Sequence, residues 1–174
     1  MIGIITLALL LTGAPGSSVA PPPQLAEETL EAIRLRARLG VREMASTQTI
    51  YVHSQSSHYV TEDFTRVATR GADGQWTVIS IGEERAGPVG PPGPPQLIPE
   101  ERRILGAGES EHLDRLLHWP PLYRQSSPGE RNPGVGAYYH VMEIVTPQGH
   151  IVLRWNGRLR GWAGAVADLI MGRG

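Results

Sequence analysis

The sequence predicts an α+β fold in which an antiparallel sheet of about five strands, in two hairpin or meander units, is covered by helices. Strand-like runs rich in β-branched and aromatic residues occur in consecutive groups around Gly-containing turns. Helix-like segments with an apolar stripe stand before, between and after these groups. The chain has 174 residues, which suits one domain with a single core. The predicted element order is α-βββ-αα-ββ-α.

Residues 1–20 have the pattern of a secretory signal peptide. Ile2 to Leu11 form a short apolar run, and small residues follow it up to Ser18-Val19-Ala20. This run is too short to span a bilayer. Two features are atypical, because no Lys or Arg precedes the run and Pro21 directly follows the best cleavage position. We predict export to the periplasm or secretion, with one domain over 21–174 and no transmembrane span after signal removal.

Composition narrows the classes of function. The formal net charge of −1 gives no electrostatic case for binding nucleic acid or an acidic membrane. The absence of Cys excludes disulfides, thiolate zinc ligands and Cys nucleophiles. The six His residues are scattered without the spacing of a helical metal site, so we expect no metal and no cofactor. We expect a monomer.

The first predicted helix covers Leu25 to Met44 and ends near Gly40. Its acidic residues come early and its basic residues late, which suits the helix dipole. Residues 47–84 then read as an antiparallel meander. Asp73-Gly74 is a strong hairpin signal between its second and third strands.

A Pro/Gly-rich segment at 86–96 reads as an extended connector. After it, Pro99 is expected to begin a short helix that Gly106 ends. Ser110 is expected to cap a second helix, which Pro120-Pro121 stops. A polar loop over 125–136 leads to the last hairpin.

The hairpin over 138–157 is the clearest local structure. If Pro147, Gln148 and Gly149 form a three-residue loop, Thr146 faces His150. Alternation along the strands then sorts the side chains into two faces. One face carries Glu143 among Tyr139, Val141, Val145, Ile151, Leu153 and Trp155, and the other carries His140, Met142, Ile144, Val152, Arg154 and Asn156. A slip of one residue would exchange these sets.

The chain ends in a predicted short strand over 158–160 and a helix that begins near Trp162 and ends before Gly172. Arg154, Arg158 and Arg160 lie just before Gly161 at the start of this helix. A helix N-terminus offers free N–H groups, and guanidinium groups bind carboxylates or phosphates. This junction is the predicted ligand site, with the anion coming either from a bound molecule or from an acid of the protein itself.

Glu143 is a predicted buried acid within an apolar layer. Burial raises the pKa of a carboxyl group and an adjacent cation lowers it. Whether protonated or ionised, Glu143 would therefore be a polar group within an apolar layer. The structural interpretation is an ion pair with an Arg from another element. The functional interpretation is a metal-free hydrolase that uses Glu143 and a His such as His140, although these two residues are expected on opposite faces.

No nucleophile motif, acid–base cluster or phosphate loop is present in the sequence. We therefore interpret the protein as a small exported envelope protein that is not an enzyme and that binds an unidentified envelope partner or a small anionic ligand. The metal-free hydrolase is the alternative.

Overall fold

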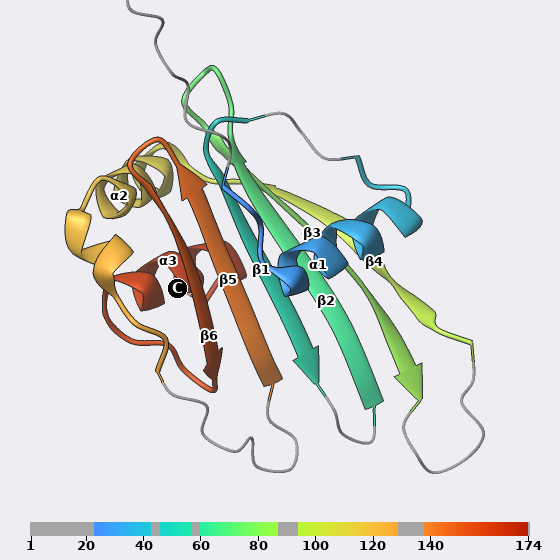
Figure 1. The fold of residues 1–174 in the computed structure, drawn as a ribbon. Coiled ribbons are helices and arrows are strands. Elements are labelled where there is room, and N and C mark those ends of the chain that lie inside the picture. The colour runs from blue at the N-terminus through green and yellow to red at the C-terminus, as the bar shows by residue number, and fades with distance from the viewer. Residues whose placement is uncertain (1–22, 43–45, 57–59, 87–93, 129–137, 174) are drawn as a thin grey trace, which may run out of the picture.

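The computed structural model describes residues 23–42, 46–56, 60–86, 94–128 and 138–173. Its centre is one six-stranded antiparallel sheet, with three α-helices and a short 3₁₀ helix packed around it (Figure 1). The predicted α+β class is confirmed. The predicted signal peptide over 1–20 and the middle of the 86–96 connector lie outside the described residues.

The sheet has the strand order β4-β3-β2-β1-β5-β6. All five neighbouring pairs are antiparallel. In chain order the elements are α1 (Glu27–Arg38), β1 (Thr49–Ser56), β2 (Val60–Arg70), β3 (Trp76–Ala86), β4 (Gln96–Ile104), α2 (Ala107–Leu117), η1 (Pro120–Arg124), β5 (Tyr138–Thr146), β6 (Gly149–Asn156) and α3 (Gly161–Met171).

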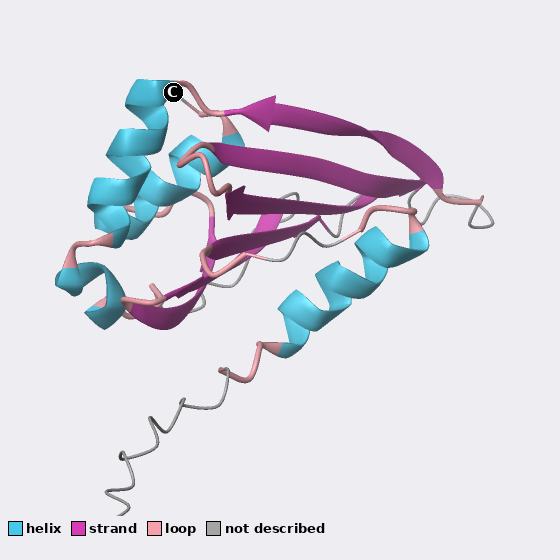
Figure 2. Cartoon of the chain, turned by 90° about the horizontal axis from the view of Figure 1, so that it is seen from above, coloured by secondary structure: helices cyan, strands magenta, loops and turns pink. Residues whose placement is uncertain are grey.

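The two faces of the sheet differ in chemistry. α2, η1 and α3 pack on one face over a large apolar cluster that includes Ile50, Trp76 and Met142 (Figure 2). α1 alone lies on the other face, where a small apolar cluster around Val67 and Ile79 is flanked by charged side chains. The apolar face stabilises the fold by burial, and α1 combines the burial of Ala32 and Leu35 with ion pairs to the sheet.

The helix predicted from Pro99 to Gly106 is wrong, because residues 96–104 form the edge strand β4. This is the strand that the predicted count of about five lacked. Pro99 is tolerated because an edge strand has one side without a hydrogen-bonded neighbour, and the β3–β4 register shifts beside it, between Ser80 and Gly82. The segment is polar and exposed along most of its length, so it carried no alternating pattern that would have indicated a strand.

The predicted cap at Ser110 is also wrong. α2 begins after Gly106, whose N–H donates to the Glu109 carboxylate at 2.8 Å. Ser110 is buried in the first turn, and its hydroxyl donates to the Leu105 carbonyl at 3.3 Å. The side chain of Glu109, and not that of Ser110, therefore caps the start of α2.

The last hairpin has a two-residue loop, so the predicted three-residue register is wrong. Thr146 pairs with Gly149 and Met142 pairs with Leu153. Gly149 begins β6 and lies against the Tyr123 ring, where an added Cβ would come within 2.7 Å of the ring. This register places Met142, Ile144, Ile151, Leu153 and Trp155 on one face, which also carries His140. It also moves Glu143 to the face that α1 covers, beside Val152 and His150.

The end of the chain follows the prediction in part. Residues 158–160 are not a strand, although Leu159 is buried between two exposed arginines as alternation implied. α3 ends at Gly172, which adopts the left-handed conformation with φ of 69°. The Asp73-Gly74 hairpin joins β2 to β3 as predicted, with φ of 84° at Gly74.

Candidate functional site

Of the four residues of the predicted anion site, Arg158, Arg160 and Gly161 lie together, whereas Arg154 does not. Arg154 lies on the α1 face and binds Glu28 through two hydrogen bonds of 2.6 and 2.8 Å. This bond to Arg154 is the main cause that lowers the pKa of Glu28. Arg154 is therefore paired internally, on the opposite side of the sheet from α3 and the Gly161 junction.

Arg158 and Arg160 remain at the start of α3. Together with Gly161 and Asp168 they line an open hollow of about 460 Å³. Arg158 is 80% exposed, and its Nη2 lies 3.5 Å from Asp168 Oδ2. The carbonyl of Arg160 accepts a hydrogen bond from the Gln125 side chain at 3.0 Å. The internal acid Asp168 thus lies near Arg158. Binding of an external anion at this junction remains a prediction.

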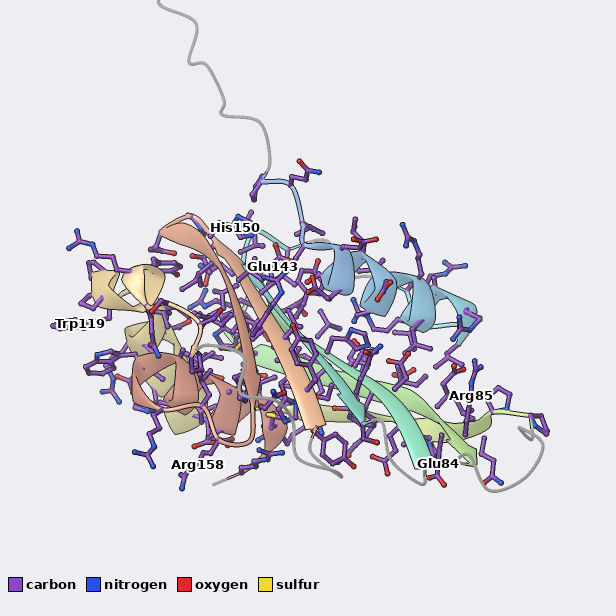
Figure 3. The ribbon with its side chains drawn as sticks, turned by 60° about the horizontal axis from the view of Figure 1, so that its bottom comes forward. Glu84, Arg85, Trp119, Glu143, His150 and Arg158 are labelled. Atoms are coloured by element: carbon purple, nitrogen blue, oxygen red, sulfur yellow. The ribbon has the colours of Figure 1, made fainter. Side chains whose placement is uncertain are left out.

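Glu143 is fully buried, as predicted, but its surroundings are polar. Its carboxylate accepts the Ala26 backbone N–H at 3.0 Å, and His150 Nε2 lies 2.5 Å from its other oxygen. Ala26 is the N-cap of α1, so a negative charge stands at the positive end of that helix (Figure 3). Glu143 therefore anchors α1 to the sheet.

The hydrolase alternative required Glu143 and a His such as His140 in one site. His140 projects toward the helix-bearing face, where its ring packs against Trp155 with ring centroids 5.0 Å apart. Glu143 projects toward α1. The sheet separates the two side chains, as the expected alternation implied.

A pocket that the sequence analysis missed lies on the helix-bearing face, where the ends of β1, β2 and β5 approach the end of α3. Its volume is about 310 Å³. The lining combines apolar, aromatic and ionisable side chains from five elements and the chain end: Ser54, Glu62, Phe64, Arg66, Ile98, Tyr138, His140, Met171 and Arg173. We call it the Arg66 pocket.

The floor of the Arg66 pocket is a hydrogen-bonded Ser–His pair. Ser54 Oγ lies 2.8 Å from His140 Nδ1, and both side chains are buried. The imidazole stacks on Tyr138, with centroids 5.9 Å apart and planes 7° from parallel. Burial lowers the pKa of His140 to about 4, and the charges of Arg173 and Arg66 act in the same direction. The imidazole is therefore neutral at pH 7.

Two arginines give the Arg66 pocket its charge. The Arg66 guanidinium lies over the Phe64 ring, 4.3 Å from the centroid. Burial lowers its pKa to about 10, and repulsion from Arg173 contributes. In the described part of the chain, no carboxylate forms an ion pair with Arg66 or Arg173.

Glu62 provides an acid at another part of the same lining. It accepts a hydrogen bond from the Tyr138 hydroxyl, which raises the pKa of that phenol. The pocket therefore has a cationic part, a neutral floor and an acidic part, with Phe64, Ile98 and Met171 supplying apolar wall. Such an arrangement suits a small molecule that carries an anionic group on an apolar body.

The one sequence signal for this site is Arg66 within a strand whose neighbours on the same face, Phe64 and Ala68, are apolar. A cation at such a position is unusual. Ser54 and His140 are 86 residues apart in the chain, so only the β1–β5 pairing reveals their contact.

Within the described residues, no group of three or more His, Asp or Glu side chains is placed to hold a metal ion. None of the helices in that part of the chain is both long and apolar enough to cross a bilayer. Comparison with models of known protein families and with curated proteins finds no match to this chain.

Proposed function

We propose that the protein is an exported binding protein whose Arg66 pocket holds a small amphipathic molecule through its carboxylate or phosphate group. The observation that carries this proposal is that two guanidinium groups, Arg66 and Arg173, line one pocket. Neither forms an ion pair with a carboxylate of the described residues, although the charge of Glu101 acts on Arg66 and Glu62 lines the same pocket. A partly desolvated cation without a counter-ion costs free energy, and a ligand anion would recover that cost.

The shape and lining of the pocket support a small ligand. Its volume of about 310 Å³ lies at the lower end of the range for ligand sites. Arg binds a carboxylate or phosphate through two parallel hydrogen bonds, which fixes orientation as well as affinity. Phe64, Ile98 and Met171 would then contact the apolar body of the ligand.

The test is a thermal-shift screen of short-chain and aromatic carboxylates and of phosphate monoesters, followed by calorimetric titration of the compounds that stabilise the protein. We expect compounds from this class to raise the melting temperature of the wild type. Replacing Arg66 with Met should weaken their binding about 30-fold, because a charge-assisted pair contributes roughly 2 kcal/mol.

Arg34→Met is the matched control, because Arg34 is an exposed arginine on α1, across the sheet from the pocket. It should bind these compounds as the wild type does. The proposal fails if no anionic compound stabilises the wild type, or if Arg66→Met and Arg34→Met bind alike.

Export is tested separately by N-terminal sequencing of protein recovered from the periplasm or culture medium. We expect a mature N-terminus near residue 21, because small residues precede that point after the apolar run. Protein recovered from the cytosol with Met1 retained would contradict export without bearing on ligand binding.

A further inference from the structure

Two large aromatic side chains are exposed together at the end of the molecule formed by α2, η1 and α3. Trp119 is 48% exposed and Trp162 is 47% exposed. Their ring centroids lie 5.5 Å apart, with the planes tilted by 42°. Trp119 precedes η1 and Trp162 lies in the first turn of α3, so the fold brings them together from distant parts of the chain. We call this contact the Trp pair.

Exposed arginines lie within five residues of each Trp in the sequence. Arg158 and Arg160 are exposed immediately before α3, and Arg124 is exposed at the end of η1. Gln125 fixes these segments to each other, because its side chain bonds the Arg160 carbonyl at 3.0 Å and the Ala163 N–H at 3.1 Å. Figure 3 shows Trp119 and Arg158 on the same end of the molecule, beside α2 and α3.

The acids of α2 and α3 are Glu109, Glu111, Asp114 and Asp168, and three of them lie against an arginine. Asp168 lies 3.5 Å from Arg158 and offsets one of the three arginines. Asp114 of α2 is bound to Arg70 and to the Trp76 indole, at 2.9 Å in each case. The chain as a whole carries −1, so the positive charge at this end is local and opposes the charge of the rest.

We infer that this surface, made of the Trp pair with Arg124, Arg158 and Arg160, docks the protein onto an anionic phospholipid membrane. Trp side chains favour the interface between water and lipid, because the indole has an apolar body and a polar N–H. Arginines beside them would face lipid phosphates, and each cation near an anionic leaflet strengthens binding. The exposed indoles match the apolar part of an anionic membrane interface, and the three arginines match its negative charge.

The test uses sedimentation of the full chain with vesicles of phosphatidylglycerol and phosphatidylcholine, and with vesicles of phosphatidylcholine alone. The variants are Trp119→Ala/Trp162→Ala and Arg158→Gln/Arg160→Gln. All proteins share residues 1–20, so differences between them report on the Trp pair and its arginines. Thermal melts confirm that each variant is folded, which exposed positions should allow.

We expect the wild type to bind the anionic vesicles at least tenfold more tightly than the neutral ones. The Trp variant should lose at least tenfold in affinity for the anionic vesicles. The Arg variant should lose about tenfold, with little change toward neutral vesicles. Leu30→Ala/Leu97→Ala removes exposed apolar side chains elsewhere and Arg34→Gln/Arg102→Gln removes exposed cations elsewhere, so both controls should bind like the wild type. The inference is overturned if the Trp variant binds anionic vesicles as the wild type does, or if the two vesicle types bind equally.

Discussion

Replacing Glu143 with leucine is expected to lower the free energy of unfolding by about 3 kcal/mol. The carboxylate is fully buried and receives the Ala26 N–H at 3.0 Å. Leucine has a similar volume, but it leaves that N–H and His150 without their acceptor. It also removes the negative charge at the positive end of α1. Denaturant unfolding at pH 7, followed by circular dichroism, measures the effect.

Two further variants separate the role of burial from that of charge alone. Glu143→Gln keeps an acceptor oxygen at the same place, so its loss should be smaller than that of Glu143→Leu. Glu28→Gln breaks the partly exposed pair between Glu28 of α1 and Arg154 of β6 and should cost less than about 1 kcal/mol. If Glu143→Leu unfolds like the wild type, Glu143 does not anchor α1.

The second large effect concerns pH. In the folded protein the pKa of His140 is lowered to about 4, first by burial and then by Arg173 and Arg66. In the unfolded chain a His titrates near pH 6.5. Between these values the unfolded chain binds a proton that the folded chain does not, so stability must fall as the pH falls. The contribution of His140 is complete above about pH 6.5, is lost progressively on acidification to about pH 4, and does not change further below that.

We expect a loss of up to about 3 kcal/mol, because the imidazole is buried and one unit of pKa corresponds to about 1.4 kcal/mol. The measurement is the free energy of unfolding at several values of pH for the wild type and for His140→Gln, which does not titrate. The hydrogen bond to Arg154 lowers the pKa of Glu28, so protonation of such carboxylates in acid also destabilises the protein. This contribution is the same in both proteins and cancels when their free energies of unfolding are subtracted. A difference between the two proteins that stays constant from pH 7 to pH 4 would contradict the assignment.

The sequence by itself determined the elements whose signals are local. The Asp73-Gly74 turn, the end of α3 at Gly172 and the strand character of 138–146 and 149–156 depend on residues within a few positions of one another. A Gly with positive φ or an alternating apolar run is favoured whatever the rest of the chain does. The burial of Glu143 could also be predicted from its position within an apolar strand. The residues that contact its carboxylate could not be predicted in this way.

The tertiary structure decided the features that depend on partners distant in the chain. Residues 96–104 became a strand because β3 offered an unpaired edge, which outweighed the helix-start signal of Pro99. The loop at Pro147-Gln148 shortened because the resulting register gives Met142 and Ile144 an apolar face against α2 and α3. Free energy of burial over a whole face exceeds the preference of one turn residue.

The Arg66 pocket and the Trp pair belong to the same class of features. Ser54 meets His140 only through the β1–β5 pairing, and Trp119 meets Trp162 only because α3 packs beside η1. The sequence identified Arg158 and Arg160 from their position before a helix, but it grouped Arg154 with them, and the sheet places Arg154 on its other face. The sequence gives the type of each side chain directly. The face of the sheet that the side chain occupies depends on long-range strand pairing, because a shift of the pairing register by one residue moves the side chain to the opposite face.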